Sequence, residues 1–231
     1  MRPINARKLI VLAIVFGAAV LSVVLVKHGA SAHTSYYQYL PIVAASPPVY
    51  VSQVVNAPSL GGGLRVTGEV ETLGTNPVYS VTLELRVYDL SSQLIGVFYE
   101  KTALLATFPG QPNPFEFHAP VFEWVWFEVN LFSWESSIEQ NIAQVTVTNI
   151  EITYDANDAV SVTTIRNDNA QPLSNVQGVA WTLRQGNFIS PVLVTNYLPP
   201  GATAVFTTTH LGEGGPGPPI IQAAAQGEVV P

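Results

Sequence analysis

The stretch Val81-Thr82-Leu83-Glu84-Leu85-Arg86-Val87-Tyr88-Asp89 alternates between apolar and polar side chains from its first residue to Val87. Successive side chains of a strand point to opposite faces, so the alternation predicts a β-strand with one buried and one solvated face. A related stretch, Val179-Ala180-Trp181-Thr182-Leu183-Arg184, follows later in the chain. The sequence therefore predicts one small β-domain that is built twice.

Length and composition agree with this prediction. The chain has 231 residues, which fits two domains of roughly 100 residues each. Charged residues make up 11%, well below the typical ~25%, whereas hydrophobic residues make up 48%, which argues against disorder. Cysteine is absent, so disulfides, thiolate nucleophiles and cysteine-based metal sites are excluded. We expect an all-β exported protein that depends on packed hydrophobic cores.

The charges are distributed unevenly along the chain. All 16 acidic residues lie after residue 32, together with five of the nine basic residues. Binding to the phosphates of nucleic acid requires a basic surface, which this acidic part of the chain lacks. We therefore expect no nucleic-acid partner.

The N-terminus carries an export signal. Residues 9–26 form an unbroken run of apolar or small residues, preceded by basic residues and followed by Ala30-Ser31-Ala32. This order is typical of a signal peptide, but the run also reaches the ~18 residues that span a bilayer. Two interpretations of residues 1–32 stay open. Cleavage after Ala32 would give a free extracellular protein, and an uncleaved helix at residues 9–26 would tether it to the membrane with the rest of the chain outside.

Turn signals divide the remainder of the chain into three parts. Residues 33–48 are rich in tyrosine and proline and are predicted to be an extended spacer. Short apolar runs separated by Gly, Pro, Asn and Asp turns every ~8–12 residues are typical of a β-sandwich. They predict one sandwich over residues 49–134 and a second over residues 143–231.

The clearest element that the two predicted copies share is Pro-Gly-x-x-x-x-Phe. It occurs at residues 109–115 and again, with identical spacing, at residues 200–206. The motif follows the alternating strand at a similar distance in both copies. We therefore expect the same turn at the same place in both sandwiches.

These motifs resemble the FxLYD-type repeat of bacterial and archaeal exported proteins. Copy one matches with Gly68-Glu69-Val70, Leu85-Arg86-Val87-Tyr88-Asp89 and the Pro-Gly turn before Phe115. Copy two matches less well, with Trp181-Thr182-Leu183 at the place of Leu85-Arg86-Val87. There Arg184-Gln185 replaces the Tyr-Asp pair, and no Gly-x-Val precedes the strand. The resemblance implies an immunoglobulin-like β-sandwich at the cell surface without catalytic residues, in which the motif positions are inward apolar residues and turn formers.

One candidate binding surface is aromatic. Phe122, Trp124 and Trp126 alternate along a predicted strand and are expected to share one of its faces. Large aromatic side chains dominate cores and domain contacts, which is one interpretation. The other is an exposed surface for a glycan or a protein partner.

Two turns are rich in oxygen ligands, namely Asp155-Ala156-Asn157-Asp158 and Asn167-Asp168-Asn169. Calcium requires about 6–8 oxygens, which two neighbouring loops can supply. Asn and Asp also occupy turns for local hydrogen-bonding reasons, so calcium binding by Asp155, Asp158 and Asp168 stays an open question. No cofactor or metal ion is otherwise expected.

The chain shows no recognised catalytic motif. His118 and His210 lack the i, i+4 spacing of a zinc motif and are predicted to lie on the surface. The sequence also lacks a Gly-x-Ser-x-Gly elbow, a P-loop and a Gly-x-Gly-x-x-Gly fingerprint. We therefore predict a non-enzymatic exported or membrane-tethered surface protein, a tandem β-sandwich that acts as an interaction or spacer module. The alternative is a glycan-binding accessory protein that uses the strand of Trp124 and Trp126.

Overall fold

The computed structural model describes residues 26–27, 48–58, 62–154, 158–182, 190–210 and 220–230. Within these ranges every regular element is a β-strand, so the all-β prediction is confirmed. The strands are β1 (Val26–Lys27), β2 (Val49–Pro58), β3 (Leu64–Thr72), β4 (Val78–Tyr88), β5 (Leu94–Lys101), β6 (Ala106–Thr107), β7 (Asn113–Ala119), β8 (Trp126–Glu135), β9 (Ile142–Tyr154), β10 (Ala159–Arg166), β11 (Leu173–Thr182), β12 (Val192–Leu198), β13 (Thr203–His210) and β14 (Ile221–Val229).

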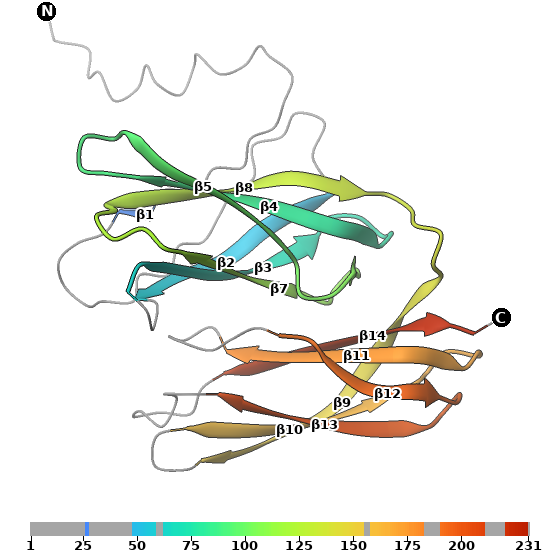
Figure 1. The fold of residues 1–231 in the computed structure, drawn as a ribbon. Coiled ribbons are helices and arrows are strands. Elements are labelled where there is room, and N and C mark those ends of the chain that lie inside the picture. The colour runs from blue at the N-terminus through green and yellow to red at the C-terminus, as the bar shows by residue number, and fades with distance from the viewer. Residues whose placement is uncertain are drawn as a thin grey trace, which may run out of the picture.

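The strands stack in four layers, which we number from the top of Figure 1 downwards. Sheet 1 is β8-β4-β5, with β1 on the free edge of β8 and β6 on β4, and sheet 2 is β2-β3-β7. Sheet 3 is β12-β11-β14 and sheet 4 is β9-β10-β13. The long strand β9 joins the last two, because its first residues pair with β14 and the following ones pair with β10.

The two halves of the chain have the same topology. When the two-residue strands β1 and β6 are set aside, each half has six strands in chain order. In each half, the first, second and fifth strands form one sheet, which is β2-β3-β7 in the first half and β9-β10-β13 in the second. The third strand lies between the fourth and the sixth in the other sheet, which is β5-β4-β8 in the first half and β12-β11-β14 in the second. Sheet 1 therefore corresponds to sheet 3, and sheet 2 corresponds to sheet 4.

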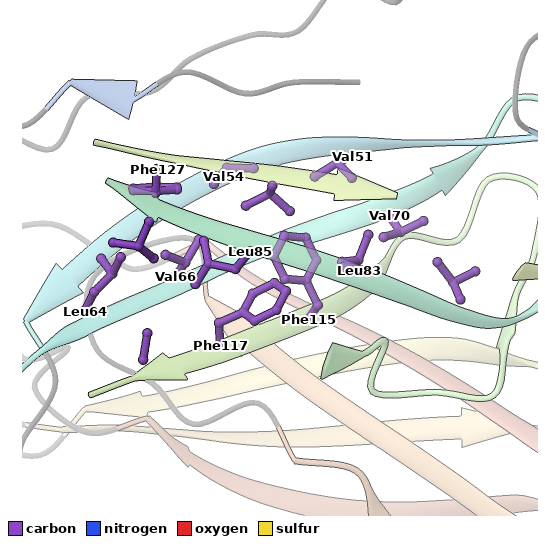
Figure 2. Packing of buried hydrophobic residues seen from close by; sticks show 14 of the residues in the cluster. Val51, Val54, Leu64, Val66, Val70, Leu83, Leu85, Phe115, Phe117 and Phe127 are labelled. Carbon is purple, nitrogen blue, oxygen red and sulfur yellow. The ribbon is translucent and has the colours of Figure 1, made fainter. Parts of the chain in front are cut away.

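Each half has its own hydrophobic core. The first core lies between sheets 1 and 2, where Leu83 and Leu85 of β4 meet Phe115 and Phe117 of β7 (Figure 2). The apolar residues of the alternating stretch are all fully buried, whereas Arg86 on its opposite face is partly exposed, so the predicted two-faced strand is confirmed. The second core consists of residues from β9 to β14 only. Burial of such a side chain contributes about 1.5–3 kcal/mol.

The shared Pro-Gly motif forms the same turn twice. Gly110 has φ 73° and Gly201 has φ 74°, a conformation that glycine adopts without steric cost. In the first turn the amide of Gln111 donates to the carbonyl of Phe108 (3.1 Å), and in the second the amide of Ala202 donates to that of Pro199 (3.1 Å). The prediction of a repeated turn is confirmed.

The motif phenylalanine lies against a strand glycine in both halves. An added Cβ would come within 2.6 Å of the Phe115 ring at Gly68 and within 2.6 Å of the Phe206 ring at Gly178. Gly68 and Phe115 are neighbours in sheet 2, whereas Phe206 of sheet 4 crosses the second core to reach Gly178 of sheet 3. The same contact is thus made within a sheet in one half and between sheets in the other.

The N-terminal predictions fall largely outside the described residues. Residues 1–25 and 28–47 are not described, and these include most of the predicted signal or anchor and nearly all of the spacer. Among the residues that the structure describes, no helix is long and apolar enough to cross a membrane.

Candidate functional site

The outer face of sheet 1 carries four aromatic side chains, and we call it the aromatic face. Its rings belong to Tyr88 of β4, Tyr99 of β5, and Trp126 and Phe132 of β8. They point away from the core because they alternate with buried residues such as Val87 and Phe127. Tyr99 and Phe132 are 50% and 58% exposed.

The four rings form two pairs. Tyr88 and Trp126 are opposite each other in the β4–β8 register and stack with ring centroids 3.7 Å apart and planes 6° apart. Tyr99 and Phe132 meet edge to face at 4.7 Å and 61°. Cross-strand aromatic pairs contribute about 0.5–1.5 kcal/mol beyond the burial of area, so the rings are held in place rather than free to reorient.

Carboxylates lie between the rings and accept hydrogen bonds from them. Glu84 accepts bonds from the Tyr99 hydroxyl (2.8 Å) and from Arg86 Nε (2.5 Å), and Glu128 accepts one from the Tyr88 hydroxyl (3.1 Å). The bond to Glu84 raises the pKa of Tyr99, while burial and then the Glu128 charge raise that of Tyr88. Both hydroxyls therefore stay protonated and continue to donate at neutral pH.

Asn130 occupies an unusual position on this face. It lies in β8 between the outward residues Glu128 and Phe132 and is nevertheless 97% buried, with an exposed fraction of only 3%. Neither atom of its amide group makes a hydrogen bond within the described part of the chain. A buried polar group without a partner costs about 1–3 kcal/mol, so the Asn130 amide is a destabilising feature of this face.

The structure separates the three aromatic residues that the sequence grouped together. The strand β8 begins only at Trp126, and Phe122 lies in the preceding bend, 69% exposed. Trp124 packs against the first core, edge to face with Phe127 at 6.0 Å. The prediction of one shared strand face is therefore wrong for Phe122 and Trp124, and only Trp126 belongs to the aromatic face.

The second notable region is the junction between the two halves, where the outer faces of sheets 2 and 3 meet (Figure 1). Leu104, from the connection between β5 and β7, packs with Val179, Trp181 and Ala224 of sheet 3 in one buried cluster. The family resemblance placed Trp181 among the inward residues of the second sandwich. The structure instead puts its neighbour Ala180 in that core and turns Trp181 towards the first half.

Polar contacts also join the two halves. The indole Nε1 of Trp181 donates to Glu69 Oε1 of β3 at 2.7 Å, and the amide of Ala106 donates to Gln226 Oε1 of β14 at 2.9 Å. Gln111 Nε2 reaches the carbonyl of Ala225 at 3.5 Å. These bonds are directional, so they fix the orientation of one half of the chain on the other in addition to the apolar contact.

Glu69 is the most perturbed acid of this junction. The residue is fully buried, and Oε2 has no hydrogen-bond partner among the described residues. Burial raises the pKa of its carboxyl to about 7; the Trp181 hydrogen bond lowers the pKa and the charge of Glu71 raises it further. The protonation of this group therefore changes near neutral pH, inside the contact between the two halves.

A hollow of about 390 Å³ opens at the rim of the junction. Its lining includes Lys101, Glu116 and His118 of the first half and Pro191 of the second. His118 Nε2 lies 2.7 Å from Glu116 Oε1, and Arg65 forms an ion pair with the same carboxylate. The Glu116 carboxylate in this hollow is thus satisfied within the protein.

The two predicted surface histidines differ in environment. The side chain of His118 is 44% exposed, as expected. The prediction is wrong for His210, which is fully buried at the end of β13 with Nε2 2.8 Å from Ser161 Oγ. Burial lowers the pKa of His210, so the ring stays neutral. Ser161 is also buried, which keeps this Ser–His pair out of contact with solvent.

The Asp- and Asn-rich turns are described only in part. Asp155 and Asn157 lie outside the described residues. Asp168 pairs with Arg166 (2.5 Å), which lowers its pKa, and the buried Asn167 donates to two backbone carbonyls. Across the described ranges no three His, Cys, Asp or Glu side chains come together as they would to hold a metal ion.

Comparison with known proteins gives little additional information. No protein-family model and no curated protein matches the chain. One solved structure with some similarity is the N-terminal CBM22-1–CBM22-2 tandem domain of Xyn10C from Paenibacillus barcinonensis. It has 7% sequence identity and a TM-score of 0.14, with 81% of this chain and 85% of that chain covered. A similarity of this size carries no argument about function.

Proposed function

We propose that this chain is a non-enzymatic surface protein, exported and then either released or tethered to the membrane through residues 9–26. Its two halves act as immunoglobulin-like β-sandwiches in tandem. Together they serve as a spacer or offer a surface for interaction with a partner. The repeated six-strand topology and the two separate cores support the tandem arrangement.

The observation that carries the proposal is the buried junction. Leu104 and Trp181 form an apolar contact between the halves, and the bond from Trp181 to Glu69 adds a fixed direction to it. A flexible pair of domains would expose these side chains to water and would need no buried bond between them. The junction therefore favours a stiff unit, which suits a module that holds an interaction surface away from a membrane or cell wall.

Fractionation of the producing cells tests the location. We expect the protein outside the cytoplasm, with an intact mass that corresponds either to a chain starting at His33 or to the full chain in the membrane fraction. A full-length chain found in the cytoplasm would contradict the proposal.

Small-angle scattering of the exported species tests the spacer role, because a stiff pair gives one fixed distance between the halves and a flexible pair gives a broad distribution.

The alternative function is glycan binding, and the aromatic face supports it better than the originally predicted strand. Aromatic rings and carboxylates occur there side by side, a combination that can stack on sugar rings and bond their hydroxyls. Affinity electrophoresis in gels that contain neutral or acidic polysaccharides tests this function. Retardation that is lost in Tyr99→Ala would favour it, whereas unchanged mobility in every gel would argue against it.

A further inference from the structure

Glu69 is a carboxylic acid that lies in the junction between the two halves. Its side chain points away from the first core, because it alternates along β3 with the core residue Val70. It is nevertheless fully buried, and Trp181 of sheet 3 lies against it. The burial of this acid therefore depends on the docking of sheet 3 on sheet 2, and separation of the halves would return it to water.

The hydrogen bond to Glu69 comes from the other half of the chain. Among the described residues, Trp181 Nε1 alone donates to Oε1, and Oε2 has no partner. The two cross-strand neighbours of Glu69 cannot add a donor. Pro114 has no N–H, and the Ser52 hydroxyl donates to Glu71 at 2.7 Å. The docked junction thus solvates a carboxylate poorly, whereas a neutral carboxyl costs much less to bury.

The adjacent charge on the same face of sheet 2 has the same sign. Glu71 is the next outward residue of β3, and its charge raises the pKa of Glu69 beyond the effect of burial. Tyr50 of β2 donates to Glu71 at 2.7 Å, and burial, followed by this bond, raises the pKa of Tyr50 to about 12. The tyrosine therefore stays neutral, and loss of the Glu69 proton places two carboxylates on neighbouring positions.

The positive groups of sheet 2 and its rim lie around another acid. Arg65 forms an ion pair with Glu116, and His118 Nε2 lies 2.7 Å from the same carboxylate. Lys101 is exposed at the end of β5 and lines the hollow at the rim. None of these groups is among the causes that set the pKa of Glu69.

Sheet 3 brings no positive charge to the junction within the residues that the structure describes. Its strands β11, β12 and β14 contain one charged side chain, the acidic Glu228, which accepts a bond from Asn175. Tyr197 of β12 is 55% exposed. The connection between β5 and β7, residues 102–112, packs on sheet 3 and has no charged residue. An ionised Glu69 in the docked junction would therefore be a buried charge opposite a surface without a cation.

We propose that ionisation of Glu69 undocks the two halves, so that the pair is rigid in acid and becomes two folded halves on a flexible connection in alkali. The inference rests on the stiff pair of the proposed function, which is its acid form. The other polar contacts of the junction, from Ala106 and Gln111, are between neutral groups and do not change with pH. Undocking hydrates the carboxylate and uncovers the apolar outer face of sheet 3 around Trp181.

The direction of the effect follows from the linkage of proton binding to docking. The pKa of Glu69 is about 7 in the docked junction, against 4.5 for an exposed glutamate, so the docked form binds the proton more tightly. This contribution to docking is complete below about pH 4.5 and is lost as the pH rises through about 7. Each pKa unit is a factor of ten, so the docking constant should fall ~thirtyfold between about pH 5.5 and 8.5.

Two neighbouring alanines of β14 allow undocking to be distinguished from unfolding. Ala224 faces the junction and Ala225 faces the second core, and both are fully buried. The sequence contains no cysteine, so Ala224→Cys and Ala225→Cys each introduce a single thiol into the full-length chain. Reaction with dithiodipyridine is timed at about pH 5.5 and 8.5. Each rate is divided by that of Leu90→Cys, an 85% exposed position, which corrects for ionisation of the thiol itself.

We expect the corrected rate of Ala224→Cys to rise at least ~tenfold between the two pH values, and that of Ala225→Cys to stay low at both. The rise should disappear when Glu69→Gln is added and persist with Glu100→Gln, an exposed residue of β5. An unchanged rate for Ala224→Cys would overturn the proposal, as would a rise that persists with Glu69→Gln. An equal rise for Ala225→Cys would also overturn it, because the second half would then be unfolding.

Small-angle scattering of the wild-type protein distinguishes failure of this proposal from failure of the proposed function. One distance between the halves at about pH 5.5 and a broad distribution at about pH 8.5 would support both. A single distance at both pH values would overturn the pH-dependent undocking and leave the stiff pair intact. A broad distribution at both would overturn the stiff pair as well.

Discussion

Glu69 shows how one residue can make the stability of the whole fold depend on pH. Its carboxyl has a pKa of about 7 in the folded protein, against 4.5 for an exposed glutamate. Between these values the folded protein keeps the proton that the unfolded chain has lost. The stabilising contribution of this group is therefore complete below about pH 4.5 and is lost as the pH rises through about 7, beyond which the group causes no further loss.

This behaviour gives the first prediction. Glu69→Gln removes the titrating group and keeps an acceptor for the Trp181 indole, so the free energy of unfolding should lose most of its decline between pH 4.5 and 7. A pKa difference of this size corresponds to about 3 kcal/mol. Urea unfolding at intervals of pH measures the effect. Glu100→Gln, an exposed residue of β5, is the control and should keep the wild-type slope; the same slope in Glu69→Gln would contradict the prediction.

Gly68 gives a second prediction at this scale. A Cβ there would meet the Phe115 ring at 2.6 Å, and the ring has no room to move because the first core surrounds it. Gly68→Ala should lower the free energy of unfolding by about 1–3 kcal/mol. Gly74→Ala is the matched control, since the nearest atoms to its added Cβ lie at 3.9 Å. Thermal unfolding compares the two, and equal melting temperatures would show that the Phe115 contact is not tight.

The sequence was least informative about which individual side chains are buried and which face they occupy. The alternation of Val81 to Val87 fixes its inward side, and the structure agrees. For Trp181 the likeness to the first alternating strand was misleading, because β11 has an irregularity between Ser174 and Gln177, after which Val176 and Ala180 face the second core and Trp181 faces away from it. A bulge of this kind depends on pairing with neighbouring strands, so a single strand sequence does not reveal it. The burial of His210 likewise depends on the partner strand that supplies Ser161.

At the scale of elements, the two Pro-Gly turns offer a matched comparison. Gly110 and Gly201 have nearly the same positive φ, and no atom lies within 4 Å of an added Cβ at either position. The cost of alanine therefore comes from the backbone alone, about 1–2 kcal/mol, and should be the same in both turns. Chemical unfolding of Gly110→Ala and Gly201→Ala measures it. A large difference between the two would mean that the turns are not equivalent.

The sequence predicted the presence of strands better than the residues at which they begin and end. Turn residues and alternation located most strands, because both are local properties of the chain. The strand β9 runs from Ile142 to Tyr154 and passes from sheet 3 to sheet 4, which no local pattern of the sequence predicts. Likewise β8 begins only at Trp126, although the aromatic alternation of the sequence predicted a strand already at Phe122. Pairing with distant strands decides both boundaries.

At the scale of the whole molecule, the junction determines whether the two sandwiches behave as one body. The outer face of sheet 3 buries Trp181 only while the halves are docked, so docking adds stability to both. We expect the wild-type protein to unfold in a single calorimetric transition, with calorimetric and van't Hoff enthalpies in agreement. Each half nevertheless has a hydrophobic core of its own, so we expect each half to remain folded after undocking.

Trp181→Phe tests this coupling because it removes only part of the contact. The smaller ring keeps an apolar side chain against Leu104 but cannot donate to Glu69, whose Oε1 would then be buried without its bond. Such a loss costs about 1–3 kcal/mol, concentrated at the junction. We expect the single transition to divide into two, and small-angle scattering to show a broader distribution of distances between the halves. Trp134→Phe, a 41% exposed residue of β8, should change neither result. If Trp181→Phe still unfolded in one transition at the wild-type temperature, the two halves would be coupled through the other contacts, namely Ala106–Gln226, Gln111–Ala225 and the apolar cluster. The Trp181–Glu69 bond would then contribute nothing to their docking.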